Sequence, residues 1–143
     1  MTVSAILKSK GTKVATTRPD TTVETVAHRL RLESIGALVV TEDGQRVLGI
    51  IAERDIVRGL AEHGASLLAM RAQDIMTRTV PTCTPETRVE RVMSQMTRER
   101  ARHVPVVEQD RLSGIISIGD VVKHRLDEME SEVRVLRDYI TAR

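Results

Sequence analysis

Two heptapeptides decide the fold of this chain: Gly49-Ile-Ile-Ala-Glu-Arg-Asp55 and Gly114-Ile-Ile-Ser-Ile-Gly-Asp120. In each, a glycine and two isoleucines are typical of a buried strand, and the aspartate follows where a helix would begin. The two glycines lie 65 positions apart. The pattern therefore indicates that one structural unit occurs twice in the chain.

The similarity extends on both sides of the heptapeptides. Residues 14–42 align with 80–108 and residues 46–58 align with 111–123, with 16 identities over 42 aligned positions. The one-residue change of offset falls in a polar turn. Such self-similarity is the sequence signature of a repeat. We therefore divide the chain into a first repeat with a helical N-terminal segment, a second repeat and a helical C-terminal extension: 1–66, 67–124 and 125–143.

Each repeat predicts the order β-α-β-β-α. A short β-prone piece precedes a helix, whose start we place at the capping boxes Thr21-x-x-Glu24 and Thr87-x-x-Glu90. Apolar residues then recur with helical spacing, two Ile/Val-rich strands follow, and a second helix begins near each aspartate. The predicted fold class is α/β (α+β), with two small sheets that are each covered by helices.

The composition limits the functions of the chain. Its 143 residues are 41% hydrophobic and include one aromatic residue, Tyr139, so the core must be aliphatic and stacking of nucleic-acid bases on rings is excluded. The formal charge is only +2 and the arginines are scattered, so we expect no nucleic-acid partner. We also expect no membrane partner and a cytoplasmic location, because long apolar stretches are absent and Cys83 is the single cysteine.

Neither a metal site nor a catalytic site is predicted. The four histidines lie far apart and show none of the spacings of metal-binding helices. Cys83 and His103 fall in the same repeat, but a catalytic pair would need a third orienting group and an oxyanion site. We therefore expect that the protein is not an enzyme and requires no cofactor.

Asp55 and Asp120 allow two interpretations. As helix N-caps each would contribute about 1 kcal/mol of stability. Alternatively, a carboxylate at a helix N-terminus can accept hydrogen bonds from two vicinal hydroxyls, as ribose presents, while the free N–H groups of the helix attract phosphate. Ser117 adds a hydroxyl three residues before Asp120, whereas Ala52 stands at the same place before Asp55. We therefore expect the second site to bind more strongly than the first.

The repeated Gly-Ile-Ile-x-x-x-Asp, with Ile35-Gly-Ala-Leu-Val-Val and Arg102-His-Val-Pro-Val-Val before it, resembles a tandem cystathionine-β-synthase (CBS) domain pair, or Bateman module. The resemblance covers residues 14–124. It implies two units packed sheet to sheet about a pseudo-twofold axis. It also implies clefts between them for a regulatory adenine nucleotide (AMP, ADP or ATP), NAD or S-adenosylmethionine, and it implies dimers.

The resemblance further implies which residues bind the nucleotide. Ile51 and Ile116 would form aliphatic walls for the adenine, and Arg54, Arg102 and His103 would face the phosphates. The full set lies at strand ends and helix starts, and comprises Thr16, Ala37, Leu38, Ile51, Arg54 and Asp55 in the first repeat and Val80, Thr82, Arg102, His103, Val104, Pro105, Ile116, Ser117 and Asp120 in the second.

The C-terminal segment carries a separate signal. Apolar residues recur at spacings of 4, 3, 4, 3 and 4, which is a heptad stripe: Val122, Leu126, Met129, Val133, Leu136 and Ile140. A helix of about 20 residues would span about 30 Å, longer than the repeat needs. The stripe would cover either the chain's own Val3, Ile6 and Leu7 or a partner subunit, and we expect a homodimer.

These patterns predict a stand-alone regulatory module that binds an adenosine-type ligand and transmits its occupancy to a protein partner or to the dimer interface. The alternative is a scaffold protein with empty clefts that recruits another protein through its long C-terminal helix. Ala52 keeps this alternative open, because the first repeat lacks the hydroxyl of the second.

Overall fold

The first repeat forms a three-stranded sheet in the order β1-β2-β3, as seen in a computed structural model that describes residues 1–142. β1 (Thr16–Thr17) pairs in parallel with β2 (Ala37–Val40), and β2 pairs antiparallel with β3 (Gly49–Ala52). The helix α2 (Val23–Leu32) connects β1 to β2. The helix α3 (Glu53–His63) follows β3 and leads into a 3-10 turn, η1 (Gly64–Ala69).

The second repeat has the same order of elements. β4 (His103–Glu108) pairs antiparallel with β5 (Arg111–Ser117), and an isolated parallel bridge from Cys83 to Val106 takes the place of β1. The helix α5 (Val89–Glu99) precedes β4, and α6 (Ile118–Thr141) follows β5. The predicted β-α-β-β-α order and the mixed α/β fold class are confirmed.

The apolar residues form one cluster under the helices of each repeat and a third between the two sheets. Successive strand residues point to opposite faces of a sheet, so the two sides of each strand serve different clusters. The third cluster contains Ala37, Val39 and Ile50 from the first repeat, with Val80, Leu112 and Ile115 from the second packed against them. The two repeats therefore pack sheet to sheet.

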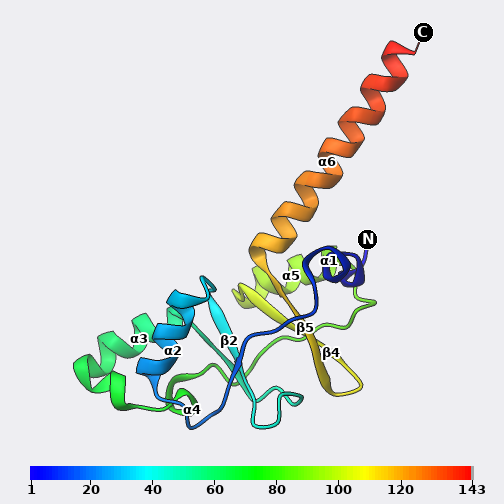
Figure 1. Ribbon diagram of the computed structural model, residues 1–143. Helices are drawn as coiled ribbons and strands as arrows, with labels where there is room; N and C mark the ends of the chain where they lie inside the picture. Colours follow the sequence, from blue (N-terminus) through cyan, green and yellow to red (C-terminus); the bar gives the residue numbers. More distant parts are fainter. Residues whose placement is uncertain (143) are drawn as a thin grey trace.

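The two repeats exchange their preceding helical segments. α1 (Val3–Lys10) lies beside α5 of the second repeat, whereas α4 (Ala72–Ile75) packs on the first (Figure 1). The backbone contacts match: Val3 N–H donates to the Thr87 carbonyl at 2.8 Å, and Ala72 N–H donates to the Thr21 carbonyl at 2.8 Å. Each repeat is thus completed by the segment that precedes the other repeat. The division of the chain into 1–66, 67–124 and 125–143 stays a prediction.

This exchange explains the two repeated glycines. A Cβ atom on Gly49 would lie 2.7 Å from the Thr77 carbonyl oxygen, and one on Gly114 would lie 2.8 Å from Leu7 Cδ2. Real Cβ atoms do not approach backbone or packed side chains so closely. Gly49 has no room for a side chain because the exchanged backbone crosses directly over the strand, whereas a side chain at position 114 would require Leu7 to move.

The predicted capping boxes of α2 and α5 are wrong by one residue. Thr22, not Thr21, is the N-cap of α2, and its side chain accepts a hydrogen bond from Thr25 N–H. Arg88 is the N-cap of α5 and makes no side-chain cap, while Thr87 accepts from Thr84 N–H at 2.9 Å within the preceding turn. In both repeats the residue after the predicted cap is still extended, so each helix begins one residue later than the sequence pattern indicated.

The helix α6 extends far beyond the body of the protein (Figure 1). Its residue Val121 is buried among α1 and α5, but the heptad stripe is not: Val122, Leu126, Met129, Val133, Leu136 and Ile140 are 48–67% exposed. The apolar residues of α1 are already buried in the core of the second repeat, so they do not cover the stripe. Within residues 1–142, no helix combines the length and apolarity that a membrane span would need.

Candidate functional site

Asp55, the aspartate of the first repeated motif, lies in the first turn of α3 and is only 4% exposed. Its Oδ2 accepts a hydrogen bond from Ala52 N–H at 2.8 Å, and its Oδ1 accepts one from the Thr77 hydroxyl at 2.8 Å. Thr77 follows α4, the segment that crosses over from the second repeat. Both carboxylate oxygens of Asp55 therefore accept hydrogen bonds from other residues of the chain.

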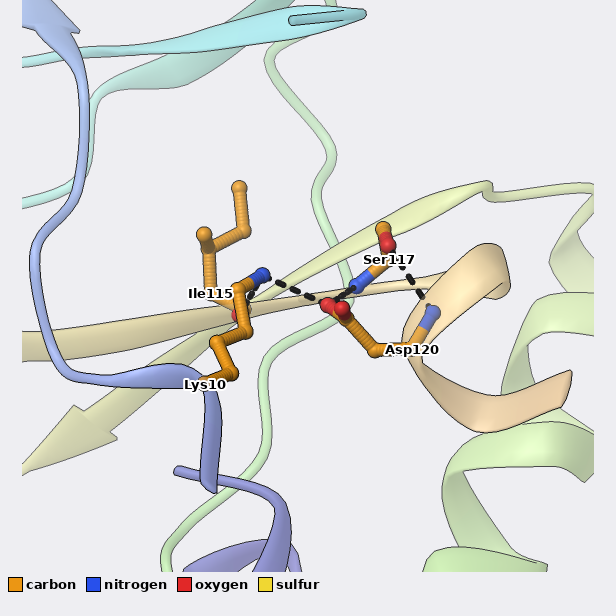
Figure 2. A network of polar contacts seen from close by, with 4 residues as sticks. All are labelled: Lys10, Ile115, Ser117 and Asp120. Atoms are coloured by element: carbon orange, nitrogen blue, oxygen red, sulfur yellow. Dashed lines mark hydrogen bonds and ion pairs between the residues drawn. The ribbon is translucent and has the colours of Figure 1, made fainter. Parts of the chain in front are cut away.

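Asp120 occupies the equivalent place at the start of α6 but has different neighbours. It forms a capping box with Ser117: Ser117 N–H donates to Asp120 Oδ2 at 2.8 Å, and Asp120 N–H donates to Ser117 Oγ at 3.1 Å. Lys10 Nζ, at the end of α1, also lies 2.5 Å from Oδ2 and donates to the Ile115 carbonyl at 2.9 Å (Figure 2).

The Asp120 side chain keeps 22% of its surface exposed. Lys10 and Ser117 N–H both donate to its Oδ2, and among the described residues no hydrogen bond ends on its Oδ1. Burial raises the pKa of Asp120, but the hydrogen bond from Lys10 and the Ser117 N–H outweigh this effect and hold the pKa below its usual 3.8. The carboxylate is therefore ionised at neutral pH and presents one oxygen to an incoming donor.

His103 stands where the two repeats meet. It is the first residue of β4 and pairs with Ser117 across the sheet. A Cβ atom on Gly36 of the first repeat would lie 3.3 Å from the imidazole ring, so the ring rests directly against that glycine. Burial, followed by the charge of Lys10, holds the pKa of His103 below 6.5, although Glu53 and Asp120 act in the opposite direction. At neutral pH the ring is uncharged.

The prediction that Ile51 and Ile116 line the cleft is wrong. Both side chains are fully buried under the helices of their own repeats, and Leu38 and Val104, which were also assigned to the cleft, are buried with them. Their strand neighbours on the opposite face point toward the other repeat. The physical reason is the two-residue period of a strand: in an Ile-Ile pair the sequence does not tell which isoleucine faces which side.

The residues that do face the other repeat are therefore Ile50 and Ile115, with Ala37 on the same side of β2. Pro105 is buried and pairs with Ile115 across the second sheet. Ile115 is half-buried, and its carbonyl accepts a hydrogen bond from Lys10. Ile115 is thus linked to Asp120 through Lys10, which bonds both, and Pro105 is its neighbour across the sheet.

The other predicted residues are only partly brought together. Arg102 is exposed next to His103, and its carbonyl accepts from Ile118 N–H at the start of α6. Arg54 crosses to the second repeat and donates to the Arg100 carbonyl at 2.8 Å. Val80 packs between the sheets. Thr16 and Thr82 line two other grooves, neither of which includes Asp55 or Asp120. Their neighbours there lie at or near the ends of strands: Thr41, Glu42 and Gly44 in the first repeat and Val107, Gln109 and Asp110 in the second.

Sequence reasoning missed Lys10, Thr77 and Gly36. Lys10 and Thr77 reach the aspartates only because α1 and α4 exchange places between the repeats. No sequence spacing reports that exchange. Gly36 carries a weak signal, since a glycine at a strand start is typical of a close approach by another group.

The remaining reactive groups are the Cys83 thiol and the possible metal ligands. Burial raises the pKa of the Cys83 thiol to about 11, so the thiol stays protonated and is a poor nucleophile at neutral pH. Among residues 1–142, no three His, Cys, Asp or Glu side chains are close enough together to hold a metal ion.

Comparison with known proteins agrees with this architecture. The family model for the CBS domain matches residues 3–62 and 72–127. The mitochondrial CBS domain-containing protein CBSX3 of Arabidopsis thaliana is 39% identical over 149 residues, covering 97% of this chain and 71% of that protein. The crystal structure of the CBS-domain protein ATU1752 from Agrobacterium tumefaciens superposes with a TM-score of 0.85 at 44% identity, covering 87% of this chain and 99% of that one.

A third similar structure contains ligands. The CBS domain pair of protein MJ0100, solved in complex with 5′-methylthioadenosine and S-adenosyl-L-methionine, has a TM-score of 0.76 and 26% identity, covering 86% of this chain and 98% of that one. The repeated sequence, the sheet-to-sheet packing and these matches agree, and the chain belongs to the CBS domain family as a tandem CBS domain pair.

Proposed function

We propose that this chain is a regulatory module that binds an adenine nucleotide (AMP, ADP or ATP) or NAD at Asp120. The observation that carries the proposal is the partly exposed, ionised carboxylate of Asp120 in the first turn of α6, whose contacts with Lys10 and with Ser117 N–H both end on Oδ2. The ligands of MJ0100 support it, since 5′-methylthioadenosine and S-adenosyl-L-methionine share an adenosine group with these nucleotides.

In this proposal each part of the nucleotide meets a suitable group. The ribose hydroxyls donate to Asp120, and the adenine lies against the aliphatic side chains of Ile115 and Pro105. Lys10 and the exposed Arg102 supply positive charge for the phosphates. Asp55 takes no ribose in this scheme, because both of its oxygens are already bonded within the protein.

Occupancy of the site would be transmitted through α6, because Asp120 lies in the first turn of that helix. In this proposal a ligand whose hydroxyls donate to Asp120 Oδ1 and whose phosphates attract Lys10 repositions Lys10, and it thereby changes how α1 is held against α6. We propose that a homodimer interface, or a protein partner, senses this change by linkage. The module itself acts without catalysis and without a required cofactor.

The alternative function is a scaffold whose clefts stay empty. Two observations favour it: Lys10 already fills one side of Asp120, and α6 exposes a long apolar stripe.

The cellular compartment of the protein also stays a prediction. The sequence favoured the cytoplasm, whereas the Arabidopsis thaliana relative is named as mitochondrial.

Titration calorimetry and thermal unfolding with adenosine, AMP, ADP, ATP and NAD test the proposal. A ligand at about one hundred times its dissociation constant stabilises the folded state by about 2.7 kcal/mol. We expect Asp120→Ala to abolish this shift and Asp55→Ala to leave binding largely intact. Asp74→Ala is the matched control, because Asp74 accepts from Arg71 N–H at 2.8 Å in the same type of cap. A flat response to all five ligands would support the scaffold instead.

A further inference from the structure

We propose that α6 forms a parallel, in-register two-stranded coiled coil with α6 of a second copy of this chain. The inference deepens the proposed homodimer and rests on it, but it does not depend on nucleotide binding. It is carried by two features of α6: an apolar stripe that the chain leaves exposed and a pattern of charges beside that stripe.

The stripe has the geometry of a coiled-coil seam. Val122, Met129 and Leu136 occupy heptad position d, and Leu126, Val133 and Ile140 occupy position a. All six side chains are 48–67% exposed. With 24 residues, α6 is about 36 Å long at 1.5 Å per residue, so most of it lies beyond the body of the protein (Figure 1).

The charges beside the stripe select the direction of the partner helix. Positions e and g carry Lys123 and Arg125, then Glu130 and Glu132, then Arg137. In a parallel coiled coil, a residue at g faces the residue at e five positions later in the other helix. Arg125 then faces Glu130 of the other copy, and Glu132 faces Arg137 of the other copy. By the twofold symmetry each attractive pair occurs twice.

The antiparallel arrangement is disfavoured by the same charges. To align the apolar layers, Leu126 must face Leu136 of the other copy, and position e then faces e while g faces g. This register places Glu130 against Glu130, Glu132 against Glu132, and Lys123 against Arg137. Like charges that face each other across a helix interface oppose that arrangement. An identical parallel helix is therefore the occupant that fits both the stripe and its flanks.

The parallel direction has a structural consequence for the proposed ligand site. α6 begins at the capping box of Ser117 and Asp120, so a parallel coiled coil brings the Asp120 sites of both copies to the same end of the dimer. Both sites then adjoin the first turns of one shared helical pair.

Cysteine cross-linking tests the direction. Leu136→Cys should form a disulfide between two copies under mild oxidation, because identical d positions face each other only in a parallel pair. Val135→Cys is the matched control: Val135 is 65% exposed but lies one residue off the seam, so it should not cross-link. The native Cys83 is buried and serves as an internal blank in the wild type. A disulfide formed only when Leu126→Cys and Leu136→Cys chains are mixed would show an antiparallel pair and overturn the proposal.

Charge exchange tests the register. We expect Glu132→Lys to weaken dimerisation by about tenfold in analytical ultracentrifugation, since two attractive pairs become repulsive. Adding Arg137→Glu should restore the wild-type affinity to within about twofold, because the pairs re-form with exchanged signs. Absence of this rescue, or a monomeric wild type at about 100 μM, would overturn the coiled coil. Neither result bears on the calorimetry of Asp120, so the two proposals fail separately.

Discussion

Asp55 and Asp120 occupy equivalent positions in two copies of one motif, yet their burial and their hydrogen bonds differ. Asp55 is 4% exposed and both of its oxygens accept hydrogen bonds from the chain. The Asp120 side chain is 22% exposed, and its protein contacts converge on one oxygen. The difference arises from the exchanged segments: Thr77 closes over Asp55, whereas Lys10 reaches Asp120 only with the end of a long side chain.

The comparison shows that a repeated motif does not imply repeated surroundings, and we propose that the roles differ as well. A buried carboxylate whose two oxygens hold two donors fixes the geometry of the polypeptide around it. A partly exposed carboxylate with a lysine beside it can exchange that partner for a ligand. We therefore interpret Asp55 as the group that joins α3 to the α4 segment, and Asp120 as the group available for binding.

The largest expected effect that tests this comparison is on stability. Asp55→Ala would leave the partly buried Ala52 N–H and Thr77 hydroxyl without their acceptor, and each such loss costs about 1–3 kcal/mol. We expect a loss of about 3 kcal/mol in the free energy of unfolding for Asp55→Ala and about 1 kcal/mol for Asp120→Ala. Urea denaturation measures both values, and equal losses would contradict the division of roles.

The positions of the two aspartates at strand–helix junctions could be predicted from the sequence. The orientation of the strand side chains and the contacts of the aspartates could not. The repeat itself identified the strand–helix junctions, and the absence of a hydroxyl at Ala52 already separated the two sites. The orientation of Ile51 and Ile116 could not be read, because two adjacent isoleucines are compatible with either strand face. The contact of Lys10 with Asp120 spans 110 positions and depends on the exchange of α1 and α4. Nothing in local periodicity reports such an exchange.

A second test exchanges the caps of the two helices. The backbone of Ala52 (φ −119°, ψ 168°) is close to that of Ser117 (φ −98°, ψ 163°), so a serine at position 52 can adopt the same cap. We expect Ser117→Ala to destabilise the protein by about 1 kcal/mol and Ala52→Ser to stabilise it by up to about 1 kcal/mol.

The control for this exchange is Ala61→Ser, an exposed position inside α3 where serine should cost about 0.5 kcal/mol. Thermal unfolding of the three variants gives the comparison. If Ala52→Ser destabilised the protein as Ala61→Ser does, the first helix start would lack room for the hydroxyl, and the difference between the sites would be steric.

The smallest expected effect concerns Lys10. Lys10→Met removes a partly exposed ion pair with Asp120 and should cost about 0.5 kcal/mol at pH 7. Because the folded-state pKa of Asp120 lies below its unfolded value of 3.8, this contribution is fully present above pH 3.8 and is lost as the pH falls through the folded-state pKa. The stability difference between wild type and Lys10→Met should therefore vanish in strong acid.

The same substitution makes a sharper prediction for His103, whose pKa Lys10 lowers and Glu53 raises. In an NMR titration of the His103 ring, Lys10→Met should move the pKa up toward 6.5, while Glu53→Gln should move it further down. The two variants thus serve as controls for each other, because a general loosening of the site would reduce burial and raise the pKa in both. Shifts of opposite sign would show that Lys10 lies close to both Asp120 and His103, within reach of the proposed ligand. Shifts in the same direction would contradict that placement of Lys10.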